Sequence, residues 1–343
     1  MSISTIESTI ETFLKKESAS GIILMFAAIF AMILANSPWA SWYNLLLDVP
    51  VVVAVGKLEI ATPLLLWIND GLMAIFFFVI GLEVKREVAH GSLSDMRQAS
   101  LPIAAAIGGM VIPAALYLSI QFGQPGMRGW GIPMATDIAF VVGCLALLGS
   151  RVPHRLRVLL LSLAIVDDIG AILVIAIGYT ESLNWQFLGL AAIAIGTVHL
   201  FSRIGVRRFP PYVVVGAVAW IALHESGIHA TLIGVILGLM TPAKSTLVPE
   251  RFREYLHEKS KEFGEEHWSQ HQQRTEVVQE VQRLTRETVS PQEYLEKVLH
   301  PWTAYIIMPV FALANAGVPI ELANLGDSVA LAVVIGLVVG KPL

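Results

Sequence analysis

The sequence contains few charged residues for its length. Only 15% of its 343 residues are Asp, Glu, Lys or Arg, whereas 55% are hydrophobic, and the mean hydropathy is +0.68. A chain of this composition has too few polar side chains to cover a water-soluble globule of its size. The scarcity of charge therefore excludes an ordinary soluble domain and predicts an all-α, polytopic membrane protein.

Cysteine is rarer still. The single cysteine, Cys144, lies within an apolar run, and one thiol cannot form an intrachain disulfide. Its scarcity excludes a disulfide framework, and Cys144 is interpreted as a small core residue. The net charge of -4 is concentrated in short segments and does not identify a charged partner. No nucleic-acid partner is expected.

Long apolar runs make up most of the sequence. A helix needs about 20 apolar residues to cross the hydrocarbon core of a bilayer. Candidate spans lie near residues 18–37, 63–82, 98–120, 131–150, 158–178, 184–202, 209–223, 226–241 and 298–318, and a further span begins near Ser328. Because many similar runs follow the first, that run is interpreted as a retained helix rather than a signal peptide.

The segments between the spans carry most of their positive charge on one side. Short cytoplasmic loops of membrane proteins are enriched in Lys and Arg. Alternate connections contain these residues, namely Lys15 and Lys16, then Lys85, Arg86 and Arg97, then Arg151, Arg155 and Arg157, then Arg203, Arg207 and Arg208. The opposite set contains only Lys57 and Arg128. The alternation predicts a cytoplasmic N-terminus.

The spans divide the chain into three parts. Residues 1–241 are expected to hold transmembrane helices 1 to 8, and residues 301–343 helix 9 and the start of helix 10. Residues 242–300 are rich in Glu, Lys and Arg, which predicts a long, charged cytoplasmic loop. The end of that loop, around Tyr294 and Trp302, could form a helix on the membrane surface.

Four charged residues lie deep within apolar spans, namely Asp137, Asp167, Asp168 and Lys341. An ionised side chain at the bilayer centre costs roughly 3 kcal/mol on insertion scales, so it indicates function by default. At about 1.5 Å per residue, the three carboxylates lie roughly 12 to 20 Å from the ends of their spans. They predict a site for a transported cation, with a purely structural ion network as the alternative.

Asp167 and Asp168 are adjacent, so on a helix their side chains point about 100° apart. One carboxylate is expected to face the ion, while the other pairs with a cation such as Lys341 or shares the ion. Repulsion between two carboxylates in a low dielectric makes a proton and a hard cation competitors for the same oxygens. If the unoccupied site cannot switch its exposure between the two sides of the membrane, this competition lets proton flow drive cation export.

The sequence before Asp137 predicts a discontinuous helix. Gly131 and Pro133 weaken the helix, and Thr136 or Asp137 could cap a second half-helix. A helix broken at mid-membrane exposes backbone groups that help to hold an ion. The alternative is a kink with Asp137 as a structural cap.

Two glycine pairs have a spacing that suits close helix packing. Gly234 with Gly238, and Gly336 with Gly340, are small-xxx-small pairs that let helices approach each other. The general glycine richness of membrane helices is the alternative explanation.

Six short motifs resemble those of the NhaA-type sodium/proton antiporters. They follow one another in the family's order, and together they are specific, although none would be alone. The motifs lie at residues 67–74 (WINDGLMA), 81–87 (GLEVKRE), 135–140 (ATDIAF), 164–171 (AIVDDIGA), 226–231 (SGIHAT) and 340–342 (GKP).

The resemblance implies a secondary active transporter, not an enzyme, which exports Na+, and Li+ as well, in exchange for H+ without a cofactor. It implies the family's twelve-helix, inverted-repeat fold in the bacterial cytoplasmic (inner) membrane, with broken helices crossing beside the ion site. The expected partners are therefore Na+, H+ and the lipid bilayer, and a homodimer is compatible with this family.

The resemblance also implies roles for the buried charges. Asp167 and Asp168 would bind the transported Na+ and the protons. Asp137, Thr136 and Lys341 would support the core of the site.

Four further residues would take part in pH regulation. The resemblance assigns Glu83, Lys85 and Glu87 to a cytoplasmic pH-sensing funnel and His229 to the pH response. An ordinary positive-inside loop explains the first three equally well, and a histidine at a helix end explains His229.

Two features depart from the family pattern. The loop after Thr241 is longer than the family's usual connection. The chain also stops at Leu343, where the second repeat begins, so helices 11 and 12 are absent. These 343 residues alone are therefore expected not to transport ions.

Two other classes of membrane protein are less favoured alternatives. An intramembrane aspartyl protease could pair Asp137 with Asp167, but its Gly-x-Gly-Asp motif is not matched, because Val166 precedes Asp167. A passive cation channel would more naturally use a ring of carboxylates at its mouth or a carbonyl filter.

Overall fold

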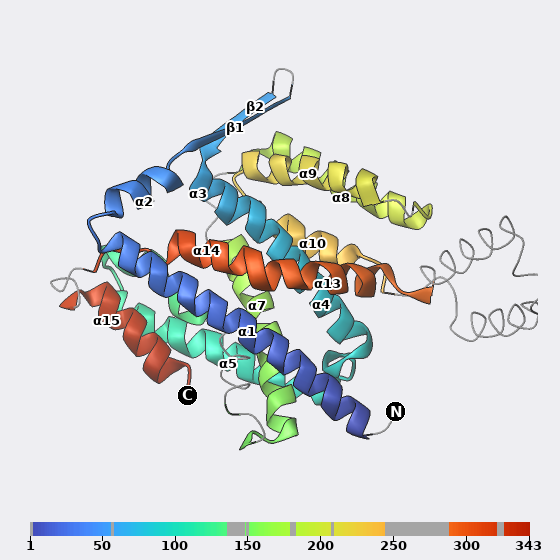
Figure 1. Cartoon of the computed structure of the whole chain (residues 1–343), viewed down its shortest axis with the longest axis horizontal. Coiled ribbons are helices and arrows are strands. Elements are labelled where there is room, and N and C mark those ends of the chain that lie inside the picture. Colours follow the sequence, from blue (N-terminus) through green and yellow to red (C-terminus); the bar gives the residue numbers. More distant parts are fainter. Residues whose placement is uncertain are drawn as a thin grey trace, which may run out of the picture.

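The computed structural model describes residues 3–55, 58–135, 148, 151–178, 183–206, 209–243, 288–320 and 326–343. These residues form helices joined by short connections, with a two-stranded β-ribbon as the exception (Figure 1). Thr136 and Asp137 lie outside the described residues, and so does most of the charged loop predicted at 242–300.

The chain begins with a long helix, α1 (Ile3–Ala35), followed by a short one, α2 (Ala40–Leu47). The apolar part of α1 and α2 meet at an angle of 116°. Large apolar side chains on α1 face outward, with Phe26 69% and Ile33 59% exposed. Such a surface would be unfavourable in water and suits contact with lipid.

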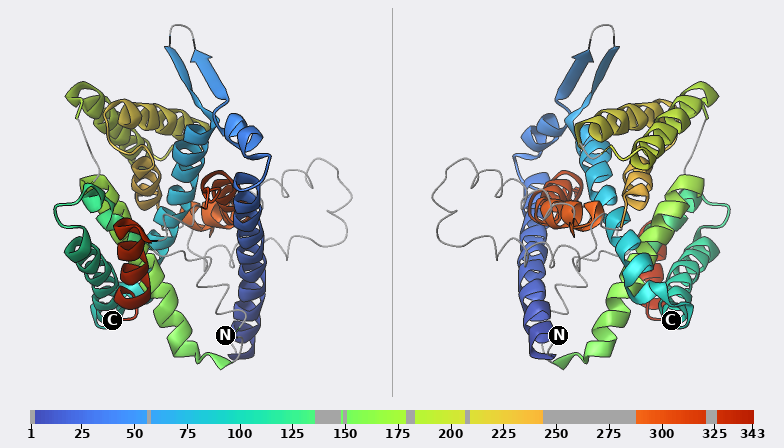
Figure 2. Two further views of the ribbon diagram at one scale, coloured as in Figure 1. Left: turned by 90° about the vertical axis from the view of Figure 1, so that its left-hand side faces the viewer. Right: turned by 90° about the vertical axis from the view of Figure 1, so that its right-hand side faces the viewer.

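A β-ribbon follows α2, where the sequence analysis expected only a connection between spans. Strands β1 (Pro50–Val55) and β2 (Leu58–Pro63) pair antiparallel, from Pro50 opposite Pro63 to Val55 opposite Leu58. The valines of β1 favour extended backbone. Figure 2 shows the ribbon projecting from the end of the helical body opposite to the N-terminus of α1.

The next helices pack around α4 (Met73–His90), which follows the short α3 (Leu64–Leu66) and the π-helix η1 (Trp67–Leu72). α8 (Trp185–Arg203) and α9 (Phe209–Glu225) lie side by side, and α10 (Leu232–Met240) crosses α4. Small buried residues, chiefly alanines of α8 and α9, form the core of this group.

The crossing of α4 and α10 confirms that the first glycine pair packs closely. A methyl group at Gly234 would collide with the carbonyl oxygen of Ala74, and one at Gly238 would collide with that of Phe78. Because these contacts are with backbone atoms, neither neighbour can rotate away.

Gly234→Ala is expected to lower the thermal stability of the protein. Overpacking of a tight interface costs about 1–3 kcal/mol, which melting in detergent would register as a lower Tm. Gly189→Ala is the matched control, since a methyl group at Gly189 on α8 meets nothing within 4 Å. Equal melting of the two variants would contradict the close contact.

A second group of helices surrounds α5 (Met96–Gln121), which follows the short 3-10 helix η2 (Ser92–Ser94). The 3-10 helix η3 (Pro125–Met134) and the helix α7 (His154–Gly178) pack against α5, as do α15 (Ser328–Ile335) and the π-helix η8 (Gly336–Gly340). Figure 1 shows α15 alongside α5. The predicted span at 131–150 thus begins in 3-10 rather than α-helical geometry.

One further helical run lies beside α1 and α4. It comprises α13 (Pro291–Trp302), the π-helix η6 (Thr303–Ile307) and α14 (Met308–Asn315). The side chain of Ser290 caps α13 by accepting a hydrogen bond from the backbone N–H of Glu293. The helix therefore begins before residue 300, inside the segment predicted as loop, because Ser290 and Pro291 form a favourable helix start.

Four described helical stretches are long and apolar enough to cross a membrane, namely Leu64–Ala89, Ala99–Gln121, Trp185–Arg203 and Pro291–Asn315. The bent pair of α1 and α2 passes the same test as one broken span. Two shorter apolar helices lie at Phe209–Glu225 and Ser328–Gly340. This composition confirms the prediction of a helical, multi-pass membrane protein.

Candidate functional site

The structure joins two of the deeply placed charges predicted from the sequence. Asp167, in the middle of α7, is only 4% exposed. Its Oδ2 atom accepts a hydrogen bond from the Nζ of Lys341 at 2.8 Å, and the two side chains form an ion pair. Two residues that lie 174 positions apart in the sequence are thus in direct contact.

Lys341 has a second oxygen partner in η3. Its Nζ donates a hydrogen bond to the backbone carbonyl of Met134 at 2.6 Å. Met134 is the last residue of η3 and is 5% exposed, and the backbone of Ala135 after it is extended. The ammonium therefore connects the segment before Asp137 to the aspartate of α7.

Removing only one partner of this ion pair is costly. Taking two charges out of water costs several kcal/mol per ion, and close contact with additional hydrogen bonds offsets that cost. If one partner is removed, the other remains buried without compensation, which destabilises a protein by about 3–5 kcal/mol. The pair between Asp167 and Lys341 thus ties η8 to α7 for as long as both groups are charged.

Asp168 has a different environment from its neighbour. It lies on the same helix, but its residue is half-buried whereas Asp167 is buried. Side chains of adjacent helical residues point about 100° apart, which accounts for the difference. Asp167 and Asp168 thus differ in exposure on α7, and their roles at the ion site remain a prediction.

A second charged cluster lies towards the C-terminal end of α4. The guanidinium of Arg86 lies 3.7 Å from carboxylate oxygens of both Glu83 and Glu87, and it pairs closely with Glu296 of α13. The amide of Gln292 donates hydrogen bonds to Glu296 at 2.9 Å and to the Leu82 carbonyl at 3.1 Å. This arrangement brings together Glu83 and Glu87, and their role in pH sensing remains a prediction.

Lys85, by contrast, takes no part in this cluster. It forms no ion pair with any residue that the structure describes. Positions 83, 86 and 87 share one face of α4, because residues three and four apart lie together on a helix, whereas position 85 points away from that face. The sequence analysis missed Glu296, which lies 210 residues from Arg86 and carries no local signal.

His229 is separate from both clusters. It is exposed and lies in the turn between α9 and α10, where its carbonyl accepts a hydrogen bond from the N–H of Leu232 at 3.2 Å. Its side chain makes no hydrogen bond or ion pair with the described residues. Its assignment to the pH response remains a prediction.

Another histidine, His224, has a charged partner that the sequence analysis did not identify. Its Nδ1 lies 3.5 Å from Oδ2 of Asp70 in η1. The indole of Trp220 stacks on the imidazole and donates a hydrogen bond to the Asp70 carbonyl at 3.1 Å. The sequence has no local signal for this contact, because Asp70 and His224 are far apart in the chain and meet only in the tertiary structure.

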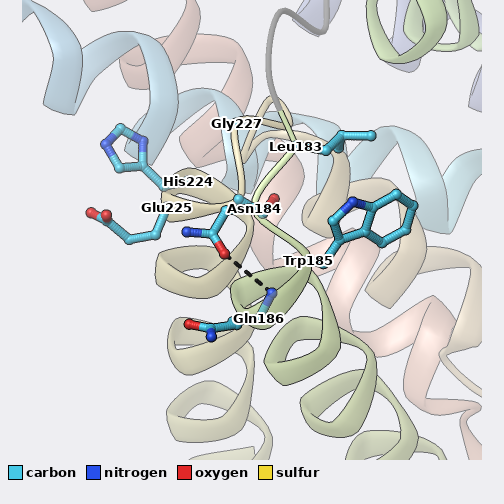
Figure 3. A pocket seen from close by; sticks show the side chains of 8 residues that line it. Leu183, Asn184, Trp185, Gln186, His224, Glu225 and Gly227 are labelled. Carbon is cyan, nitrogen blue, oxygen red and sulfur yellow. Dashed lines mark hydrogen bonds between the residues drawn. The ribbon is translucent and has the colours of Figure 1, made fainter.

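A shallow pocket of about 720 Å³ lies beside His224 (Figure 3). Its lining residues are Leu183, Asn184, Trp185, Gln186, His224, Glu225, Ser226 and Gly227. The Asn184 side chain caps α8 by accepting a hydrogen bond from the N–H of Gln186 at 3.1 Å. None of the predicted site residues lines this pocket.

No group of three His, Cys, Asp or Glu residues within the described parts of the chain could hold a metal ion. The described oxygens at the ion pair are the carboxylate of Asp167 and the carbonyl of Met134, a type of ligand that hard cations prefer. Thr136 and Asp137, predicted as supporting residues, lie outside the described residues.

Comparisons with known proteins agree with the six family motifs found in the sequence. The profile of a family described as Na+/H+ antiporter 1 matches residues 11–343. The chain is 73% identical over 331 residues to a protein of Rhodopirellula baltica named Na(+)/H(+) antiporter NhaA, covering 96% of this chain and 75% of that protein. It is 47% identical over 341 residues to Na(+)/H(+) antiporter NhaA 2 of Acidiphilium cryptum, covering 99% and 76% of the two chains.

Proposed function

The chain belongs to the Na+/H+ antiporter 1 family, and we propose that it exports Na+ by letting Na+ and protons compete for Asp167 and Asp168. As a member of this family it is a secondary active transporter and not an enzyme. Neither the protease nor the channel alternative is supported by the names of its relatives. The observation that carries the mechanism is the buried ion pair between Asp167 and Lys341.

The ammonium of Lys341 makes Asp167 a site of competition. A proton, a Na+ ion and the ammonium each neutralise the same carboxylate, and a low dielectric strengthens each of these interactions. Binding of Na+ or a proton at Asp167 therefore weakens the hold of this carboxylate on Lys341. Li+ prefers the same hard oxygen ligands and is proposed as a second substrate.

The two carboxylates also give a reason why an unoccupied site should not switch its exposure from one side of the membrane to the other. Two ionised carboxylates and one ammonium give Asp167, Asp168 and Lys341 together a net negative charge. Such a charge is costly within a bilayer. Protons or Na+ remove it, so a loaded site can change its exposure more readily than an empty one, which couples the two ion flows.

The inverted-repeat fold with a discontinuous helix near Asp137 is part of the proposal. It is supported by the 3-10 geometry of η3 and the extended backbone at Ala135, immediately before the predicted break. Placement in the bacterial cytoplasmic membrane is supported by the family and its relatives, and a cytoplasmic N-terminus by the distribution of Lys and Arg between the loops.

The direct test is proton release on addition of Na+ to everted vesicles that contain the full-length protein. A pH-gradient dye is expected to recover fluorescence with Na+ and Li+ but not with choline. A sodium current without proton movement would identify a channel, and it would contradict the proposal. Cleavage of membrane peptides without proton release would identify a protease.

The cluster around Arg86 is proposed to regulate transport by pH. Arg86→Gln is expected to shift the pH of half-maximal exchange to more alkaline values, because Glu83, Glu87 and Glu296 would repel each other when ionised and a proton relieves that repulsion. Proton release measured from pH 6 to 9, as an approximate working range, would show the shift. Arg97→Gln, at an exposed position outside the cluster, is the control and should leave the profile in place, and identical profiles for both variants would contradict the proposal.

A further inference from the structure

The segment that carries Lys341 rests on α5 and η3 through two glycines. Gly336 and Gly340, the first and last residues of η8, are buried. A methyl group at Gly340 would lie 2.8 Å from the Cα of Pro113, and one at Gly336 would lie 2.8 Å from the Cβ of Pro133. Side chains essentially never approach so closely, so any larger residue would push η8 away from the two prolines.

The two prolines cannot move aside. Both are fully buried, with less than 2% of their surface exposed. The atoms that face Gly340 include the backbone N of Pro113, which would lie 3.1 Å from an added methyl group. Because a proline ring also fixes its own backbone angle, neither proline has an alternative rotamer that would make room.

These contacts lie one residue away from the ion pair. Lys341 follows Gly340, and Met134 follows Pro133. The Nζ of Lys341 is 2.6 Å from the Met134 carbonyl and 2.8 Å from the carboxylate of Asp167. Because N–H···O hydrogen bonds span only about 2.7–3.2 Å, a displacement of η8 by a few tenths of an ångström lengthens and weakens these two contacts.

We propose that Gly336 and Gly340 are positioning residues that set the affinity of the site for Na+, because they fix how closely the Lys341 ammonium approaches Asp167. This inference rests on the proposed function, since it takes Na+ and the ammonium as competitors for one carboxylate. A larger residue at either position holds the ammonium farther from Asp167. Na+ then displaces a weaker competitor and binds more tightly.

Gly340→Ala tests the proposal through binding of Na+. At a fixed alkaline pH, the Na+ concentration that gives half of the sodium-induced rise in Tm is expected to fall about threefold, as for the loss of part of one pairwise interaction. The same fall is expected in the Na+ concentration for half-maximal proton release. Gly336→Ala should change both values in the same direction.

Two matched glycine substitutions separate positioning from general destabilisation. Gly108→Ala on α5 adds a methyl group that meets nothing within 4 Å, so neither Tm nor the response to Na+ should change. Gly234→Ala overpacks the distant crossing of α4 and α10, so it should lower Tm without changing the half-saturating Na+ concentration. A merely structural role of Gly340 would give the same result as Gly234.

A second variant keeps the test decisive if Gly340→Ala does not fold. Pro113→Ala removes ring atoms beside Gly340, creates no clash and restores a helix-forming residue in α5. The substitution loosens the contact of η8 with α5, so the half-saturating Na+ concentration should also fall.

An unchanged or raised half-saturating Na+ concentration in the variants would overturn the inference while leaving antiport intact, provided that the wild type responds to Na+ and Asp167→Asn does not. A wild-type protein without any response to Na+ would instead contradict the proposed function, and the inference with it.

Discussion

Asp167→Asn and Asp168→Asn are each expected to reduce sodium-dependent proton release by about a hundredfold or more. Each substitution removes a charged oxygen ligand from a low-dielectric site, which costs about 3 kcal/mol or more, and about 1.4 kcal/mol corresponds to a factor of ten. An amide also cannot take up a proton as a carboxylate does, so the competition between ions is lost. Dye dequenching in everted vesicles measures both effects.

The two variants should differ in stability, which makes the prediction sharper. Asp167→Asn removes the partner of Lys341 and should lower Tm, whereas Asp168→Asn leaves the ion pair between Asp167 and Lys341 in place and should lower Tm less. Asp327→Asn is the control, because this exposed aspartate precedes α15 and lies outside the site. Normal exchange by both site variants would show that the site has been assigned to the wrong residues.

Lys341→Met is expected to have the largest effect on stability. It preserves most of the apolar stem but leaves the buried carboxylate of Asp167 without its ammonium partner, which costs about 3–5 kcal/mol. Melting curves in detergent measure the drop in Tm.

A double variant provides the corresponding check. Combining Lys341→Met with Asp167→Asn removes both charges, and replacement of a whole buried pair is often neutral or stabilising. The double variant should therefore melt at a higher temperature than Lys341→Met alone. Lys85→Met, which changes a lysine outside any ion pair with the described residues, should have little effect. Additive losses in the double variant would show that the two residues do not depend on each other.

The Arg86 cluster shows which contacts can be predicted from spacing along a helix and which cannot. Positions 83, 86 and 87 share a helical face by their spacing alone, so the sequence could have grouped them without Lys85. Glu296 could not be found in this way, because it belongs to a helix separated from α4 by several other elements.

The second glycine pair illustrates the same limit. Its spacing predicted close packing but not against which surface, and the structure places Gly336 and Gly340 on two buried prolines. The β-ribbon was missed because its apolar strands are too short to differ from a connection in a search for membrane spans.

The sequence by itself determined the membrane class, the family motifs and the depth of the acids at 167 and 168, because composition, run length and local order carry that information. Tertiary structure decided that Asp167 pairs with Lys341. It also decided that the Met134 carbonyl shares the ammonium. Adjacent helical residues differ by about 100° in direction, and a backbone carbonyl has no sequence signature, so only the packing of η3, α7 and η8 could select these partners.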